Sequence, residues 1–467
     1  MKSDHRVKFG SRLRRSVLAV GVAVGAIGAS GASASTLYFD FNKNAVGGAA
    51  NASVFLFGAA GQNATITNNA GYDTSVVLNV DGFYNLPIAN SWQQSGTGVL
   101  QSGFKVVSDT PIAGYFVNRA SFTTDMTYLL DSKALGNNYV VASQGGGFGE
   151  GSQVAIHATE NNTQVTFKPV GGAVVNVTLQ AGETYKYAGG STNLTGSFVS
   201  SDKPVAVFGG HECAQVPVGR TACDTLLEQM IPTDKLSKDY LVTASQPAAG
   251  AGIGYDLMRV IATADNTSVE VNGAVVATLA AGQVYEFNLN GGTGAKIEAS
   301  NAVMVAQYLI GQSGSSTNTD PAMSLVPGAN TWLAKYRLSA PTGSQDFGVD
   351  YASIVIDEDD LDSLMLDGIL VNTGAFTAIG GTGYFRGLVD ISTKGLFDLI
   401  ADNPFLVMLG GGSNYDSYLT YGGATFAPGI SPPPPPPPPP NGVPEPSSLG
   451  LLGLALAVFG IRRRRQS

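Results

Sequence analysis

Short apolar runs alternate with polar, glycine-rich breaks along residues 36–428. The segments "SVFLFG", "GSFVSSDKPVAVFGG" and "ASIVIDEDD" are typical, since each holds a few apolar residues, and Gly, Asn or Asp interrupts the run. Alternation of this kind, bounded by turn-forming residues, is the pattern of β-strands. We find no amphipathic helical pattern longer than about two turns. The sequence therefore predicts an all-β body.

The body also repeats itself. "VVSDTPIAGYF" at 106–116 recurs as "VSSDKPVAVFG" at 199–209, and more weakly as "EASNAVMVAQY" at 298–308 and "LIADNPFLVML" at 399–409. A repeat of roughly 95–100 residues has the size of a seven-stranded β-sandwich. We therefore expect four tandem sandwich-like modules. A β-propeller with two blades per repeat is the alternative.

Two local signals predict turns inside each repeat. Asn161-Asn162-Thr163 and Asp265-Asn266-Thr267 precede equivalent strands, and Asn tolerates the left-handed backbone that a tight hairpin needs. The Asp-x-Pro triplets are expected to turn the chain and then start a strand, where the missing N–H of proline does little harm.

The chain begins with a pattern typical of secretory signal peptides. Six Lys or Arg residues precede the apolar run "VLAVGVAVGAIG", and Ala32-Ser33-Ala34 supplies small residues at the cleavage site. We assign residues 1–34 to the signal peptide and expect the exported chain to start at Ser35.

The far end combines a spacer, a motif and a short apolar helix. Residues 429–442 hold nine consecutive prolines, which form a stiff polyproline spacer about 28 Å long. The apolar run 449–461 is about 20 Å of helix, too short for a comfortable permanent span of a ~30 Å bilayer core. The motif and the basic end consist of Val443, Pro444, Glu445, Pro446, Arg462, Arg463, Arg464 and Arg465.

These parts, in this order over 443–467, resemble the PEP-CTERM sorting signal. The resemblance implies transient insertion of the C-terminal helix into the inner membrane of a Gram-negative bacterium. It also implies removal of the tail by an exosortase, and delivery to the cell surface or an exopolysaccharide matrix.

Charge narrows the choice of partner. The two end segments hold ten basic and two acidic residues; subtracting them from the totals of 26 and 35 leaves 16 basic and 33 acidic residues, a net charge of −17. Such a body is repelled by nucleic acid, so we expect no nucleic-acid binding.

The order of motifs in residues 35–428 carries a second resemblance. Asp125 precedes "LGNNYVV", Asp224 precedes "EQMIPTDKLSKDYLV", and Asp320 precedes "VPGANTWLAKYRL"; "DKPVAVFGGHECAQVP" and "NYDSYLTYGG" complete the series. This series is similar to the N-terminal domain of IgGFc-binding proteins. The resemblance implies an extracellular binding or adhesive module, without matched residues for immunoglobulin contact.

The two cysteines, Cys213 and Cys223, predict a disulfide in an exported chain. A metal site is the alternative, because His211, Glu212 and Asp224 lie in the same segment. That segment lacks the paired ligand spacing usual for zinc.

A second cation candidate is the acidic run "DEDDLD" at 357–362. Asp357, Asp359, Asp360 and Asp362 are candidate calcium ligands, although the glycine and the closing glutamate of an EF-hand loop are missing. The alternative is a solvated hairpin turn. We expect no other cofactor.

The usual enzyme motifs are absent from the sequence: it contains no G-x-S-x-G, H-E-x-x-H or P-loop. His157 has Ile261 as its repeat counterpart, which favours a structural role. The sequence therefore predicts a non-enzymatic surface or matrix protein that binds extracellular polysaccharide or a surface glycoprotein and supports biofilm or aggregate structure. A glycosidase of the matrix is the alternative, since its carboxylate pair is defined only in space.

Overall fold

The computed structural model describes residues 34–45, 52–245, 254–311, 320–341, 347–413 and 415–426. Within these ranges the chain is built of β-strands, as predicted. The described helices named here are 3₁₀ helices of three residues each: η1 (Asn90–Trp92), η2 (Ser132–Ala134), η3 (Thr233–Lys235), η5 (Ala329–Thr331), η7 (Glu358–Asp360) and η8 (Thr373–Ala375). No helix in this part of the chain is long and apolar enough to cross a membrane. The predicted C-terminal helix lies outside the described residues.

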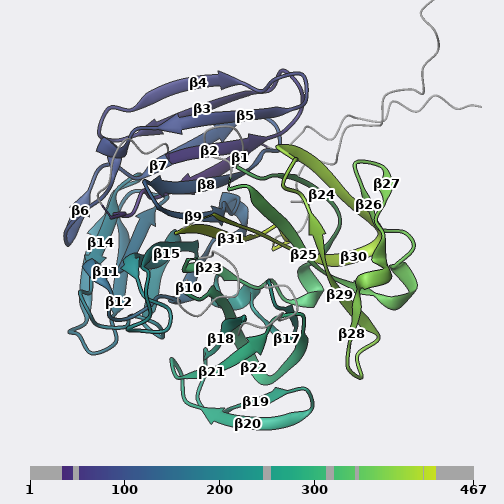
Figure 1. Cartoon of the computed structure of the whole chain (residues 1–467). Helices are drawn as coiled ribbons and strands as arrows, with labels where there is room; N and C mark the ends of the chain where they lie inside the picture. The colour runs from purple at the N-terminus through teal and green to yellow at the C-terminus, as the bar shows by residue number, and fades with distance from the viewer. Residues whose placement is uncertain are drawn as a thin grey trace, which may run out of the picture. The chain divides into compact units, whose positions relative to one another are not determined.

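The first module consists of two four-stranded antiparallel sheets (Figure 1). One sheet has the order β1-β7-β3-β4 and the other the order β5-β2-β8-β9. The bounds are β1 (Ser35–Phe39), β2 (Ala52–Phe57), β3 (Asn63–Asn68), β4 (Asp73–Val77), β5 (Phe83–Ile88), β7 (Phe104–Ser108), β8 (Ala113–Ala120) and β9 (Thr123–Tyr128). A short strand, β6 (Gly98–Leu100), leaves this module and pairs with β14 of the next one.

The second module joins the same strand order into one curled sheet, because a single 17-residue strand runs through both halves. Its strands are β10 (Gly136–Val140), β11 (Phe148–Ala158), β12 (Thr163–Lys168), β13 (Val175–Leu179), β14 (Thr184–Ala188), β15 (Phe198–Ala214) and β16 (Asp224–Gln229). The long strand β15 pairs with β10 and β12 near its start and with β11 and β16 near its end.

The third and fourth modules follow the second. The third consists of β17 (Ser237–Thr243), β18 (Tyr255–Ala262), β19 (Thr267–Val271), β20 (Ala274–Leu279), β21 (Val284–Asn290), β22 (Gly294–Leu309) and β23 (Ala322–Leu325). The fourth consists of β24 (Leu333–Ser339), β25 (Val349–Asp357), β26 (Met365–Leu366), β27 (Ile369–Leu370), β28 (Thr377–Ile379), β29 (Tyr384–Asp390), β30 (Leu396–Ser413) and β31 (Asp416–Tyr421). One folded unit per repeat is what the repeat length predicts.

The structure differs from the prediction in two details of the turns. The Asp-x-Pro triplet separates β7 from β8 in the first module, but Asp202 and Pro204 lie inside β15, where the strand passes from one set of partners to the other. Asn162 and Asn266 do adopt the predicted left-handed backbone, each with φ 56°. They connect β11 to β12 and β18 to β19, however, and these strands pair with others and not with each other, so the turns are not hairpins.

A buried tyrosine fastens the first strand of each later module to the long strand. The hydroxyl of Tyr139 accepts a hydrogen bond from the N–H of Gly136 (2.8 Å) and donates one to the carbonyl of Val205 (2.6 Å). Tyr240 and Tyr336 make the same pair of bonds in the third and fourth modules. All three rings are buried, and burial raises the pKa of each hydroxyl.

The last strands of the four modules meet each other. Strand β9 contacts β16 and β31, and β23 contacts the same two, so the contacts form a closed cycle. Figure 1 labels β9, β23 and β31 in the middle of the view. Side chains of β9 bind backbone N–H groups of β16: Thr123 binds Thr225, Asp125 binds Leu227, and Thr127 binds Gln229. One hydrophobic core cluster includes residues of all four modules.

Candidate binding site

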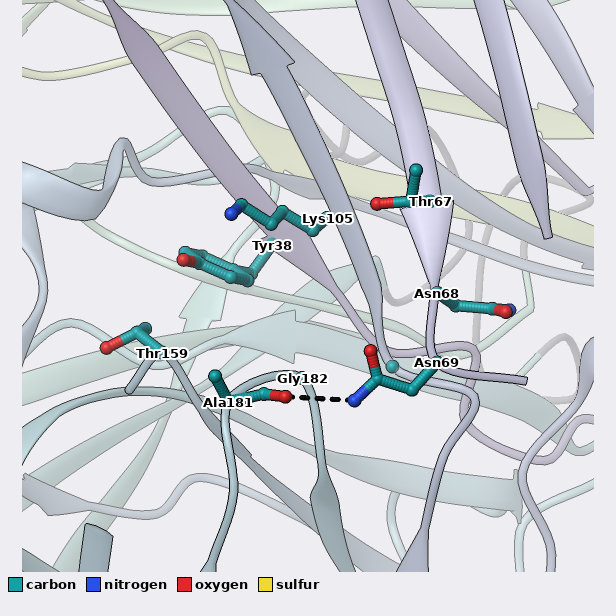
Figure 2. A pocket seen from close by; sticks show the side chains of 9 residues that line it. Tyr38, Thr67, Asn68, Asn69, Lys105, Thr159, Ala181 and Gly182 are labelled. Carbon is teal, nitrogen blue, oxygen red and sulfur yellow. Dashed lines mark hydrogen bonds between the residues drawn. The ribbon is translucent and has the colours of Figure 1, made fainter. Parts of the chain in front are cut away.

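A polar pocket of about 240 Å³ lies where the first and second modules meet (Figure 2). Its lining comes from β1, β3 and β7 of the first module and from two loops of the second. The lining residues are Tyr38, Thr67, Asn68, Asn69, Gly103, Lys105, Thr159, Ala181 and Gly182.

Strand register builds the wall on the side of the first module. Tyr38 on β1 and Thr67 on β3 both lie directly opposite Lys105 on β7. Side chains of directly opposed residues lie on one face of a sheet, so a phenol, an ammonium and a hydroxyl form one row. Lys105 is exposed, and among the described residues we find no ion-pair partner for it.

The opposite wall is held to the first by a direct hydrogen bond. Asn69 donates from Nδ2 to the carbonyl oxygen of Ala181 at 2.9 Å, as the dashed line in Figure 2 shows. The next residue, Gly182, has φ +83°, and a Cβ there would lie 2.7 Å from Asn69 Nδ2. A side chain at Gly182 would therefore strain the turn and displace the Asn69 side chain from its hydrogen bond.

A buried polar network supports the pocket from behind. The Tyr38 ring packs edge-on against His157, with ring centroids 4.9 Å apart. A Cβ on Gly103 would lie 2.7 Å from the same imidazole, so the chain passes closely over it. Asp40 accepts hydrogen bonds from Thr184 (2.6 Å) and Gln94 (2.7 Å) and lies 3.3 Å from His157 Nδ1.

The electrostatics of this network are those of a structural support. Burial by itself raises the pKa of Asp40, but His157, Thr184 and Gln94 together hold it below its ordinary value. Burial, followed by repulsion from Asp131 and Glu160, raises the pKa of Tyr38 to about 12, so the phenol stays protonated and can donate. His157 is fully buried and has no contact with solvent.

The pocket can bind a polar ligand, and its lining is poor in catalytic groups. It offers the hydroxyls of Tyr38, Thr67 and Thr159, the Lys105 ammonium and amide groups. The lining includes no carboxylate, histidine or cysteine, so it lacks the pair of acids that a glycosidase uses.

The two cysteines form the expected disulfide. Their sulfur atoms are 2.01 Å apart. His211 donates from Nε2 to the carbonyl of Gly146 (2.8 Å) and accepts the N–H of Cys213 at Nδ1 (3.0 Å), and burial lowers its pKa to about 4. Both ring nitrogens of His211 and both sulfurs of the alternative metal site are thus engaged within the protein.

One oxygen of each remaining member of that alternative set also accepts a hydrogen bond. Glu212 accepts the N–H of Glu150 at 2.6 Å, and Asp224 accepts the N–H of Thr225 at 2.7 Å. Within the described ranges no group of three or more His, Cys, Asp or Glu residues could hold a metal ion.

The candidate calcium run forms a turn. Asp357 ends β25 and caps η7 by accepting the N–H of Asp359 at 3.0 Å. Asp360 is buried and accepts a hydrogen bond from Asn403 at 2.9 Å. Asp362 lies in the turn that follows. Calcium binding at this run stays a prediction.

The residues of the export signals lie almost entirely outside the described part of the chain. This applies to Ala32 and to the motif residues Val443, Pro444, Glu445, Pro446, Arg462, Arg463, Arg464 and Arg465. Ala34 is exposed and directly precedes β1, and its carbonyl accepts a hydrogen bond from Lys133 Nζ at 2.8 Å.

Sequence reasoning did not identify any pocket residue. No motif joins Tyr38, Thr67, Lys105, Thr159 and Gly182, because they come from five separate segments and meet only through strand pairing and the contact between modules. Register knowledge for β1, β7 and β3 could have found the row of three side chains.

The described chain is an all-β protein built from repeated modules, and the pocket between the first two modules is a candidate binding site. A sequence model of the family described as IgGFc binding protein matches residues 125–411, from β9 to the end of the long strand of the fourth module. The chain belongs to this family. The PEP-CTERM protein-sorting motif matches residues 442–465, which confirms the resemblance of the C-terminal segment to this sorting signal and supports an exported, extracellular or surface protein processed by exosortase.

The human IgGFc-binding protein is 26% identical over 313 residues, which cover 64% of this chain and 6% of that protein. The chain thus spans a small part of this relative, whose name is that of a binding protein and not of an enzyme. Among solved structures, a tetra-tandem repeat from the extending region of a large adhesion protein aligns at 11% identity, over 79% of this chain and 92% of that one. Its TM-score of 0.10 is too low to carry an argument.

Proposed function

We propose that this protein is exported, sorted to the surface or extracellular matrix of a Gram-negative cell, and binds extracellular polysaccharide through the pocket between its first two modules. The binding supports exopolysaccharide, biofilm or aggregate structure. The observation that carries the proposal is the row formed by Tyr38, Lys105 and Thr67 on the pocket wall.

The chemistry of the lining favours a sugar over a flat protein surface. Sugars present many hydroxyls, each of which both donates and accepts, and the pocket offers hydroxyls, amides and one ammonium within a concave space. A hydrophobic patch, which the core of a protein interface would need, is missing from the lining. Surface glycoproteins present the same sugar chemistry and are the second source of ligand.

The Lys105 ammonium favours a ligand that carries negatively charged or hydrogen-bond-accepting groups. Although the processed body carries a net charge of −17, the exposed Lys105 ammonium is a local positive charge in the pocket and can bind a carboxylate or hydroxyl group of a sugar unit. A charge-assisted hydrogen bond from Lys105 strengthens binding more than a neutral one would.

The test is glycan binding by the exported chain, measured on a panel that includes the producer's own exopolysaccharide. Lys105→Ala is expected to weaken binding about tenfold, and Thr67→Val less. Lys335→Ala is the matched control, because Lys335 is an exposed lysine on β24 of the fourth module. Equal binding by wild type and Lys105→Ala would exclude this pocket as the site.

A further inference from the structure

A lysine is buried beside a glutamine in the second module, away from the pocket lining. Lys186 on β14 has no exposed side-chain surface. Its Nζ lies 2.5 Å from Gln153 Oε1 and 2.8 Å from the carbonyl oxygen of Gln94. Strands β11 and β14 are antiparallel neighbours, and Figure 1 labels them side by side. Ala155 lies opposite Lys186, so Gln153 is the diagonal neighbour of Lys186 on the same face.

The carboxamide of Gln153 is held in place and polarised by the first module. Its Oε1 accepts the backbone N–H of Lys43 at 3.0 Å, and its Nε2 donates to the carbonyl of Lys43 at 2.7 Å. When the lysine amine adds to the carbonyl carbon, the Lys43 N–H remains as a donor to the oxygen. A donor in this position stabilises the negative charge that develops on a carbonyl oxygen when a nucleophile adds to its carbon.

A carboxylate with an unused oxygen completes the group. Glu150 Oε2 lies 3.7 Å from Lys186 Nζ and is buried without a hydrogen-bond partner among the described residues. The other oxygen of Glu150 accepts the N–H of Gly96 at 2.8 Å, which fixes the orientation of the carboxylate. Glu150 is thus placed to carry a proton between the amine and its surroundings.

The amine can reach its uncharged, nucleophilic form. Burial lowers the pKa of Lys186 to about 8, while Glu150, Asp40 and Glu212 oppose the shift and Lys43 adds to it. A substantial fraction of Lys186 is therefore neutral at mildly alkaline pH.

We propose that Lys186 and Gln153 form an intramolecular isopeptide bond that cross-links β14 to β11, with Glu150 as the proton carrier. The neutral Nζ attacks Cδ of Gln153, a new Nζ–Cδ bond forms, and the Cδ–Nε2 bond breaks. Glu150 takes a proton from Nζ and delivers it to Nε2, which leaves as ammonia. No oxidant, reductant or further reactant is needed, because an amine and a primary amide give a secondary amide and ammonia.

A purely structural role for Lys186 is the competing explanation, and the repeats supply its control. The equivalent of Lys186 in the fourth module is Arg386, which donates to the carbonyl of Ala244 in the module before it. Lys186 does the same toward Gln94. Lys186→Arg therefore keeps a buried cation that the fold accepts at this position, but it removes the nucleophile.

The test is the intact mass of the exported chain, purified from its producer, with the disulfide taken into account. We expect the wild type to be lighter than its sequence by one ammonia and its digest to contain one peptide pair joined through Lys186 and Gln153. Lys186→Arg and Gln153→Ala should each have the full mass and lack the pair. Glu150→Gln should form the link slowly, if at all, in freshly purified protein.

Full mass for the wild type, with Lys186 and Gln153 recovered in separate unmodified peptides, would overturn the proposal whether or not any variant folds. A joined pair in Lys186→Arg would assign the link to other residues and would overturn it as well. Complete linkage in fresh Glu150→Gln would overturn the role of Glu150.

Discussion

The carboxylate of Asp125 in the first module accepts a hydrogen bond from the backbone N–H of Met323 in the third, at 3.0 Å and across 198 residues of chain. The same carboxylate accepts the N–H groups of Leu227 (3.0 Å) and Leu419 (3.3 Å), which belong to the second and fourth modules. One side chain thus binds the last strand of each of the other three modules. Burial raises the pKa of Asp125, and these backbone donors oppose the shift.

Asp125→Asn should destabilise the whole body. The amide NH₂ cannot accept a hydrogen bond, so at least one buried backbone N–H loses its acceptor, at a cost of about 2–4 kcal/mol. The midpoint of urea unfolding should fall accordingly. Asp239→Asn, at an exposed position on β17, is the control for loss of charge alone. Equal midpoints for the two variants would show that the central hydrogen bonds contribute little.

Stability should decrease as pH rises from acidic values toward neutrality, because carboxylates crowd the start of the last strands. Burial, opposed by Arg119 and Thr124 and increased by Asp320, raises the pKa of Asp416 to about 7. Burial and the charges of Asp416 and Asp320 raise the pKa of Asp224.

The direction of this pH dependence follows from proton binding. An unfolded Asp titrates near about 4, so between there and about 7 the folded protein binds protons that the unfolded chain does not. Asp416 therefore contributes stability that is fully present below the pKa of Asp in the unfolded chain. This stability is lost as pH approaches the pKa of Asp416 in the folded protein. Thermal midpoints measured across this range should fall for the wild type and fall less for Asp416→Asn. Parallel curves would contradict the assignment.

Reduction of the Cys213–Cys223 bond should weaken the second module. The bond closes a loop with a sequence separation of 10, and loops of this size lose about 3 kcal/mol of stabilisation on opening. Dithiothreitol should lower the unfolding midpoint of the wild type and leave that of the Cys213→Ser, Cys223→Ser double variant unchanged. A response of the double variant would mean that the reductant acts elsewhere.

Removal of residues 443–467 should prevent sorting. The full chain is expected on the cell surface or in the matrix, with a processed mass that lacks the tail, whereas the truncated chain is expected to bypass retention. Replacement of Arg462, Arg463, Arg464 and Arg465 by alanine is the finer variant, since it keeps the length and removes only the charge that stops export. Identical location and mass for all three forms would contradict the proposal.

The local and repeated parts of the fold could be predicted, and the parts that depend on contact between modules could not. Asn162 and Asn266 predict left-handed turns because few other residues tolerate that backbone conformation. Tyr139, Tyr240 and Tyr336 recur at matching places in the motif series. Lys105, Lys186 and Asp125 carry no such signal, because their roles depend on partners supplied by strand register or by another module.

The contact between the first and last modules has a mechanical consequence. Strand β31 is hydrogen-bonded to β30 and packs against β9, and just beyond it the carbonyl of Gly422 accepts a hydrogen bond from Tyr115 on β8 at 2.8 Å. A pulling force that enters the body from its C-terminal side is therefore divided between the fourth module and the first. Modules joined in this way resist a stretching force together, whereas modules without such contacts would unfold one after another.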